Sequence, residues 1–253
     1  MTADWGSLAF LAATALVVGA FIGTTGIGGV LLIPALIVPG GLTVHQAAAT
    51  TLASMLFIGV LGTWLFLRRG TLDARLALPV CAGAAGAGYL GAMAAGHIEA
   101  RPLALVIGTL IVVAGALILR PPPVLAHARD ARAERWRLAG VGAVSGFGSG
   151  LSGAGGPIFS VPLMIALGFA TLGAVGVAQA LLIVAAISGS VANLQAGAVD
   201  FPALALITVF QLLGLTGGVR LAHSLPVSML RRGAAWLCIV AGAAMAARAL
   251  LSA

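Results

Sequence analysis

Long apolar runs separated by short polar breaks dominate this chain, and the runs fall into two length classes. Six have the length of one membrane crossing, about 20 residues, and cover approximately 44–67, 76–95, 102–119, 172–195, 201–222 and 227–251. Two others, 8–38 and 138–167, are too long for one simple span and contain glycines that break helices. None alternates in polarity like a membrane β-strand. The pattern predicts an all-α integral membrane protein, a polytopic helical bundle whose two longest runs form broken or re-entrant helices.

Each long run is interrupted by glycines mixed with small hydroxyl residues. The two clusters are Gly23-Thr24-Thr25-Gly26-Ile27-Gly28-Gly29 and Ser149-Gly150-Leu151-Ser152-Gly153-Ala154-Gly155-Gly156. Lipid offers no hydrogen bonds, so irregular backbone at this depth must face protein or a ligand. A broken helix also leaves unpaired N–H groups and a positive dipole end, which can bind an anion without a buried arginine. We therefore expect an anion site where the two clusters face each other near the membrane midplane.

The candidate substrate-binding residues lie in these clusters and on two neighbouring helices. They are Thr24, Thr25, Gly26, Gly28, Gly29, Thr50, Thr51, Ser54, Ser149, Ser152, Gly153, Gly155, Gly156 and Gln179. At Gly28 and Gly155 we expect the backbone to approach the ligand closely and to need positive φ. An alternative is that the glycines serve only close helix crossing, as in Gly19-x-x-x-Gly23, Gly142-x-x-x-Gly146 and Gly146-x-x-x-Gly150. Likewise, Thr50 and Ser54 could serve packing and bond only to the preceding turn.

The chain repeats itself at a constant offset of 127 residues, the separation of Gly26 and Gly153. The same offset relates Gly28 to Gly155, Gly29 to Gly156, Gly70 to Gly197, Asp73 to Asp200 and Gly91 to Gly218. Aligned Gly-x-Gly-Gly blocks and paired Gly-x-x-Asp motifs indicate a duplication. We expect a first transmembrane repeat at 1–119, a basic cytoplasmic linker at 120–137 and a second repeat at 138–253.

The positions of the arginines bear on how the two repeats are oriented. With eight full spans the repeats would be parallel, and nine arginines would lie on the linker side against four. If each broken helix returns to its own side, six full spans remain, the repeats are inverted, and eleven arginines lie with the linker against two. Cytoplasmic loops carry an excess of Lys and Arg, so the inverted arrangement is favoured.

Composition excludes several other classes of protein. Hydrophobic residues make up 61% of the chain, charged residues 8%, and the mean hydropathy is +1.16, which is outside the range of soluble domains. The net charge of +7 reports membrane orientation rather than nucleic-acid binding. Cys81 and Cys238 lie in apolar runs without metal-ligand spacing, so we expect neither metal nor cofactor. The N-terminus lacks the basic start of a secretory signal, and the first run is expected to be retained.

Two features of the sequence resemble those of enzymes but lack the required context. The segment 148–153 fits G-x-G-x-x-G, yet no strand precedes it and no acidic residue follows at the right distance. Ser149 could be a nucleophile with His223 as its base, but His223 lies at the end of a span, where interfacial placement is commoner. We expect no enzymatic activity. Asp73 and Asp200 are expected to cap helices, with proton coupling as the alternative.

These motifs resemble those of the sulfite exporter TauE/SafE family of membrane permeases over nearly the whole chain. The resemblance rests on the Gly-x-Gly-Gly blocks, Thr50-Thr51, Gly70-x-x-Asp73, Gly197-x-x-Asp200 and the basic linker. It implies export of small sulfur-containing anions, such as sulfite or sulfoacetate, across the bacterial inner membrane. One departure is Val177-Ala178-Gln179, where the family often repeats a Thr-Ser pair.

The expected partners are therefore a small anionic substrate and the lipid bilayer, without nucleic acid, and a homodimer is left open. An anion channel and a transporter of another small organic anion are the alternatives.

Overall fold

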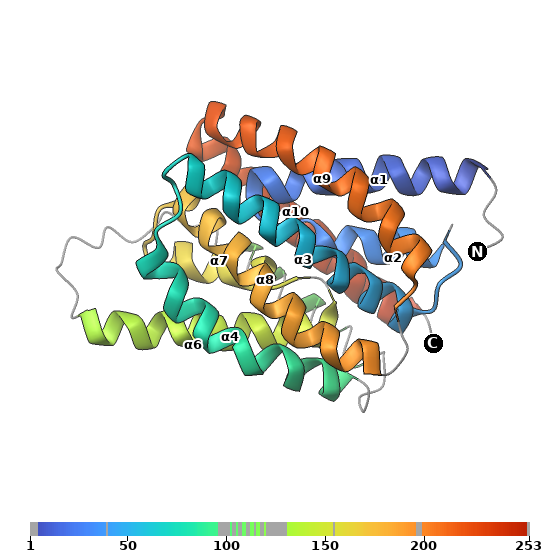
Figure 1. The fold of residues 1–253 in the computed structure, drawn as a ribbon, viewed down its shortest axis with the longest axis horizontal. Coiled ribbons are helices and arrows are strands. Elements are labelled where there is room, and N and C mark those ends of the chain that lie inside the picture. The colour runs from blue at the N-terminus through green and yellow to red at the C-terminus, as the bar shows by residue number, and fades with distance from the viewer. Residues whose placement is uncertain are drawn as a thin grey trace.

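The structure, a computed structural model, describes residues 5–38, 40–95, 131–153, 155–195 and 199–251, with scattered residues between 102 and 119. The described part contains helices and no strand (Figure 1). Its elements are α1 (Trp5–Thr25), η1 (Gly29–Leu31), α2 (Leu32–Ile37), α3 (Val44–Arg68), α4 (Ala74–Ala95), α6 (Ala131–Ser152), α7 (Pro157–Ala166), α8 (Thr171–Gln195), α9 (Phe201–Ser224) and α10 (Val227–Leu251).

Among the described residues, five helices are long and apolar enough to cross a membrane, namely α1, α3, α4, α8 and α9. The predicted all-helical membrane class is confirmed. The predicted span at 102–119 and the linker up to residue 130 lie largely outside the described residues. Because α6 begins at Ala131, the last residues of the predicted linker are helical.

Helix starts follow the capping signals in the sequence. Thr43 precedes α3 and its Oγ1 accepts a hydrogen bond from the Gln46 N–H at 3.2 Å, while Gln46 Oε1 accepts one from the Thr43 N–H at 3.1 Å. This reciprocal pair of hydrogen bonds is a capping box. Asp200 caps α9 by accepting the Ala203 N–H at 2.9 Å, and Asp73 accepts the Arg75 N–H at 2.8 Å before α4. The predicted capping roles of both aspartates are confirmed.

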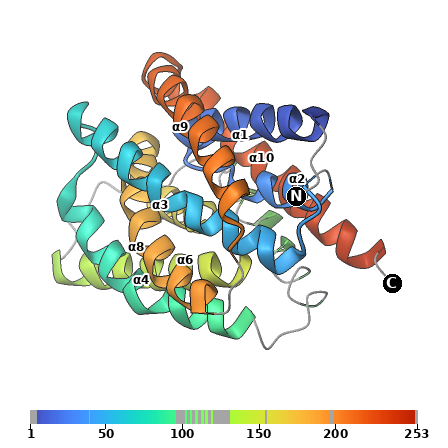
Figure 2. The ribbon, with the colours of Figure 1, turned by 45° about the vertical axis from the view of Figure 1, so that its right-hand side comes forward.

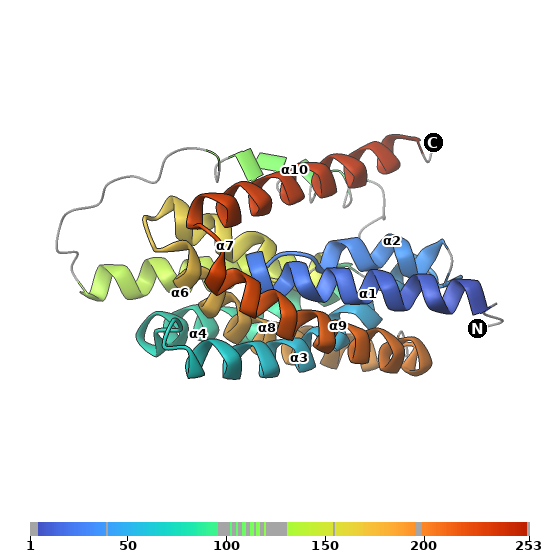
Figure 3. The same cartoon turned by 90° about the horizontal axis from the view of Figure 1, so that it is seen from above.

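The two longest apolar runs fold as hairpins. α1 ends at Thr25, Gly26 follows with φ of +79°, and α2 turns back beside α1. α6 ends at Ser152, Gly153 and Gly155 follow with φ of +64° and +87°, and α7 turns back in the same way. Figures 1 and 3 show that the α1–α2 hairpin opens toward the end marked N, whereas the α6–α7 hairpin opens toward the opposite end. The two hairpins therefore enter the bundle from opposite ends, as inverted repeats require.

Two helix pairs, α1 with α9 and α4 with α6, pack backbone against backbone. A Cβ added to Gly19 would overlap the carbonyl oxygen of Gln211, and one added to Gly142 would overlap that of Val80. A Cβ added to Gly23, Gly146 or Gly150 would likewise lie less than 3.0 Å from an atom of the facing helix. The close-crossing function of the three Gly-x-x-x-Gly motifs is thus confirmed, because only glycine permits this separation.

The contacts in these two pairs match at the 127-residue offset found in the sequence. The contact of Gly19 with Gln211 corresponds to that of Gly146 with Ala84. The contact of Gly23 with Leu215 corresponds to that of Gly150 with Gly88. The contact of Gly218 with Ala20 corresponds to that of Gly91 with Phe147. Each pair takes one helix from each half of the chain. The agreement supports the predicted duplication.

Between the two pairs, α3 and α8 lie side by side in the middle of the bundle (Figure 2). They cross at Gly59 of α3, where an added Cβ would lie 2.9 Å from the Ile183 nitrogen and 3.0 Å from the Gln179 carbonyl oxygen. α10 lies along the outer side of this assembly (Figure 3).

Hydrogen bonds between distant segments show which helix ends share a side. Arg69 donates to the Val219 carbonyl at 3.4 Å, and Thr71 Oγ1 lies 3.3 Å from His223 Nε2, so the α3–α4 turn meets the end of α9. At the other end the Asp200 N–H donates to Thr50 Oγ1 at 3.0 Å. Arg69 and Arg220 therefore lie at the same end. The alternative of eight spans in parallel repeats places these two arginines on opposite sides, so their shared end favours the inverted arrangement.

Candidate functional site

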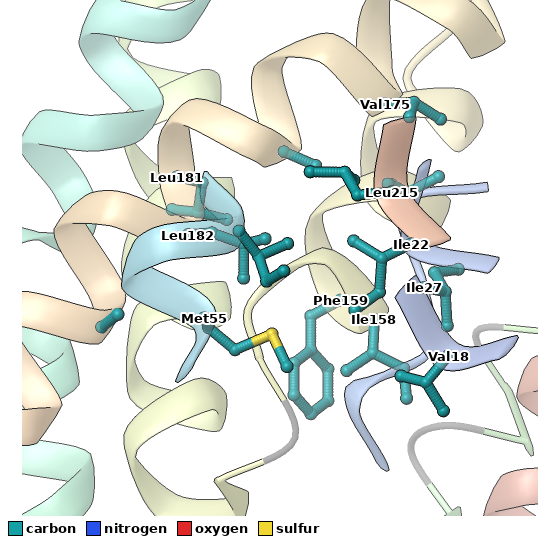
Figure 4. Packing of buried hydrophobic residues seen from close by; sticks show 14 of the residues in the cluster. Val18, Ile22, Ile27, Met55, Ile158, Phe159, Val175, Leu181, Leu182 and Leu215 are labelled. Atoms are coloured by element: carbon teal, nitrogen blue, oxygen red, sulfur yellow. The ribbon is translucent and has the colours of Figure 1, made fainter. Parts of the chain in front are cut away.

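The two glycine breaks meet in the centre of the bundle around a small hollow. The space that the centre of a water-sized sphere can occupy in it is only about 10 Å³, room for one water molecule. Its lining comes from the first break, from the start of α7, and from facing positions on α3 and α8: Ile22, Gly26, Ile27, Gly28, Gly29, Met55, Pro157, Ile158 and Leu182. Figure 4 shows the apolar side chains that gather here. The structure thus brings together the two clusters, which the sequence separates by half its length.

Backbone N–H groups supply the polar part of this site. Within the described part of the chain, the N–H groups of Gly28, Gly29, Gly155 and Gly156 have no hydrogen-bond partner. Gly156 precedes α7, so its N–H and that of Gly155 lie at the positive end of that helix's dipole. Gly28 and Gly29 line the hollow directly, and Gly155 lies against the side chains of Met55 and Leu182 that line it.

The backbone conformation differs between the two breaks. Gly155 has the expected positive φ, and so do Gly26 and Gly153. Gly28 has a φ of 169°, which is extended backbone open to any residue, so the expectation of positive φ at Gly28 is wrong. The positive φ that needs glycine in the first break occurs two residues earlier, at Gly26. A Cβ at Gly28 would instead be crowded, at 3.0 Å from the Val18 carbonyl oxygen.

Most of the hydroxyl groups at the breaks bond to their own helix. Thr24 donates to the Ala20 and Phe21 carbonyls, at 3.0 and 3.1 Å, and Thr25 donates to the Phe21 carbonyl at 2.9 Å. Thr25 Oγ1 also accepts the Ile27 N–H at 3.2 Å, which fixes the start of the first break. Ser152 donates to the Gly148 carbonyl at 2.6 Å. These hydroxyls therefore stabilise the broken helix ends.

On α3 the three candidate hydroxyls have different surroundings. Ser54 donates to the Thr51 carbonyl at 2.7 Å, and Thr50 accepts from the Asp200 N–H. The hydroxyls of Thr51 and, on α6, Ser149 are fully buried and have no hydrogen-bond partner among the described residues. Whether either contacts a substrate stays a prediction.

Gln179 connects the first break to α8. Its Nε2 donates to the Ile22 carbonyl at 3.1 Å, and Ile22 lines the hollow. Its Oε1 is buried without a partner and lies where a Cβ on Gly62 would be, so the amide fills the gap between α8 and α3. An unpaired buried amide oxygen is costly, about 1–3 kcal/mol. Gln179 thus joins α1, α3 and α8 at the level of the break.

The sequence interpretation missed two kinds of residue. Met55, Pro157, Ile158 and Leu182 line the hollow but were not candidates, because apolar side chains in a membrane helix carry no signal of function. Met55 and Leu182 are, however, separated by the same offset of 127 residues, which could have identified them. Gln211 of α9 was also missed: it is fully buried, and neither amide atom has a partner.

The hydrolase alternative finds no support in the described geometry. His223 Nδ1 bonds the Val219 carbonyl at 2.8 Å, its Nε2 faces Thr71, and its ring lies 5.4 Å from that of Phe66. All these contacts are at the α3–α4 end, away from Ser149. Among the described residues no group of three His, Cys, Asp or Glu could hold a metal ion.

A helical bundle with two opposed broken hairpins and unpaired backbone N–H groups at its centre defines a multi-pass membrane transporter. The model of the family described as sulfite exporter TauE/SafE matches residues 11–245, and the chain belongs to this family. It is similar to the "Probable membrane transporter protein YdhB" of Bacillus subtilis (strain 168), with 26% identity over 216 residues, which cover 83% of this chain and 87% of that protein. No solved structure matches it at a significant level. The protein is thus a transporter and not an enzyme.

Proposed function

We propose that this protein exports small sulfur-containing anions, such as sulfite or sulfoacetate, across the bacterial inner membrane. The proposal rests on the unpaired N–H groups at the two breaks in the described part of the chain. Gly28 and Gly29 line the central hollow, and Gly155, which precedes Gly156, lies against Met55 and Leu182, whose side chains line it. Hydrogen bonds from neutral donors to a charged acceptor contribute about 1.5–3 kcal/mol each, so a few of them can hold an anion. The absence of charged side chains from the lining lets the anion leave again.

Binding would use backbone more than side chains. Most candidate hydroxyls already bond to their own helices. Among the candidate residues, Thr51, Ser149 and Gln179 have buried polar atoms without a partner in the described structure. The two hairpins open toward opposite ends of the bundle, which gives the hollow one neighbouring hairpin on each side of the membrane. Alternate opening toward the two sides would then carry the anion across.

Transport by purified protein in liposomes tests this proposal. Liposomes preloaded with unlabelled sulfite should accelerate the entry of labelled sulfite, because a carrier exchanges one for the other. Chloride and acetate serve as comparison anions. Dissipation of the gradient without counterflow would favour a channel, and exchange of acetate but not of sulfite or sulfoacetate would favour another organic anion as the substrate.

A further inference from the structure

We propose that Met55 and Leu182 form a paired apolar gate between the two glycine breaks and set the size of the anion that the site accepts. The proposal rests on the proposed function, because it assumes that the anion occupies the hollow between the breaks. It concerns two side chains that make no hydrogen bond to the anion. Their contribution is steric.

Both side chains lie at the centre of the site. Each is 1% exposed, and each lines the hollow (Figure 4). A Cβ on Gly155 would lie 3.3 Å from Leu182 Cδ2 and 3.8 Å from Met55 Cγ, so the pair also borders the second break. Gly28 and Gly29 line the same hollow from the other break. Any anion that bonds to both breaks must therefore contact or displace these two side chains.

The helices that carry the pair are held at a fixed separation. α3 and α8 cross at Gly59, one turn beyond Met55, where an added Cβ would lie 2.9 Å from Leu182 Cβ. Backbone contact at the crossing leaves no room for the helices to move closer. The free space between the breaks thus depends on the length and rotamer of the two side chains.

The 127-residue offset relates Met55 to Leu182, so each is the counterpart of the other in the opposite half. Both side chains have flexible γ and δ positions and no β-branch, so they can change rotamer when the site opens. Methionine and leucine also exclude water, which strengthens hydrogen bonds from the breaks.

The test compares transport of sulfite with that of the longer sulfoacetate in liposomes, for Met55→Ala and Leu182→Ala. Removing either side chain should raise the ratio of sulfoacetate to sulfite transport by about tenfold, the scale at which a pocket discriminates small differences in substrate size. Leu182→Phe should lower the ratio. Leu52→Ala is the matched control, because Leu52 is a fully buried α3 residue that contacts Gly189 and does not line the hollow.

The milder variants Met55→Val and Leu182→Val keep the measurement available if an alanine variant fails to fold. They should shift the ratio in the same direction. The gate proposal is overturned if the ratio of sulfoacetate to sulfite transport is unchanged in all gate variants, or if it changes equally in Leu52→Ala. In that case, sulfite transport by the wild type still supports the proposed function. A wild type that carries neither anion overturns both.

Discussion

The glycines at the two breaks are required for different reasons, either a positive φ or close packing. The reason at each position determines the effect of substituting alanine there. Gly155 needs its positive φ, whereas Gly28 has extended backbone and is only crowded. Gly153 has both constraints, since an added Cβ would lie 2.6 Å from the Ala48 carbonyl oxygen. Gly155 is therefore the position at which a substitution perturbs the site with the least damage to packing.

Gly155→Ala should weaken the binding of sulfite at least several-fold while the protein still purifies as a folded species. The left-handed conformation costs a non-glycine residue about 1–2 kcal/mol, so the backbone will move its N–H away from the ligand. Equilibrium binding of labelled sulfite to purified protein measures the change. Gly140→Ala is the control, because Gly140 lies on α6 with open space around it. Equal affinities for both variants would place the anion elsewhere.

Ser149→Ala should leave thermal stability unchanged or slightly raised. The Ser149 hydroxyl is buried without a partner, so its removal sacrifices no hydrogen bond within the protein. Its transport rate should fall by no more than about tenfold, the effect of one lost hydrogen bond to a ligand. Thermal unfolding in detergent and liposome uptake measure the two effects. A covalent adduct between a fluorophosphonate and Ser149 would revive the hydrolase interpretation.

At the scale of helices, stability depends on the glycine faces of α1 with α9 and of α4 with α6. Adjacent glycines on one helix differ sharply in this respect. A Cβ on Gly218 would overlap the Ala20 carbonyl oxygen, whereas one on Gly217 would meet no atom within 4 Å. The same contrast separates Gly91 from Gly86 on α4.

Gly218→Ala and Gly91→Ala should each lower the unfolding temperature, by a loss of about 1–3 kcal/mol from overpacking. Gly217→Ala and Gly86→Ala should be neutral or slightly stabilising, because alanine favours the helix by about 1 kcal/mol over glycine. Thermal melts of the four variants in one detergent give the comparison. Similar melting temperatures within each pair would contradict the backbone-to-backbone packing.

Local signals in the sequence predicted most of the elements but few of their contacts. The caps at Asp73 and Asp200 and the glycine breaks are encoded by a few adjacent residues, and each was predicted. The pairing of α1 with α9 was not, because glycine faces do not specify which other helix they meet. The apolar lining at Met55 and Leu182 was missed for a related reason. In membrane-spanning helices, hydrophobicity does not distinguish residues that pack in the core from residues that line a binding site.

At the scale of the whole molecule, the arginine-rich helix ends lie together. The α3–α4 turn, the start of α6 and the α9–α10 turn lie at one end of the bundle (Figures 1 and 3), where Arg68 also stacks 3.9 Å from the Trp64 ring centroid. Tryptophan is enriched at membrane interfaces, and an excess of arginine marks the cytoplasmic one. This end is therefore predicted to be cytoplasmic.

Single cysteines at Arg69, Arg135 and Arg232, in a background without Cys81 and Cys238, should all react with an impermeant maleimide from the cytoplasmic side. A cysteine at His45, which is exposed at the start of α3, should react from the opposite side. Labelling of inverted and right-side-out vesicles gives the assignment. Reaction of the Arg69 and Arg232 positions from different sides would refute the inverted arrangement.

The exchange of helices between the two halves has a consequence for biosynthesis. α1 is synthesised early, but the helix that packs against its glycine face, α9, is synthesised only near the end of the chain. In the same way, the partner of α4 is α6, which belongs to the second half. Neither half alone can cover these faces. A chain severed between residues 120 and 130 should consequently yield two fragments that are each degraded when expressed separately and that persist and recover sulfite transport when expressed together. The cell must hold a half-made bundle in the bilayer, with its backbone exposed, until the second half arrives.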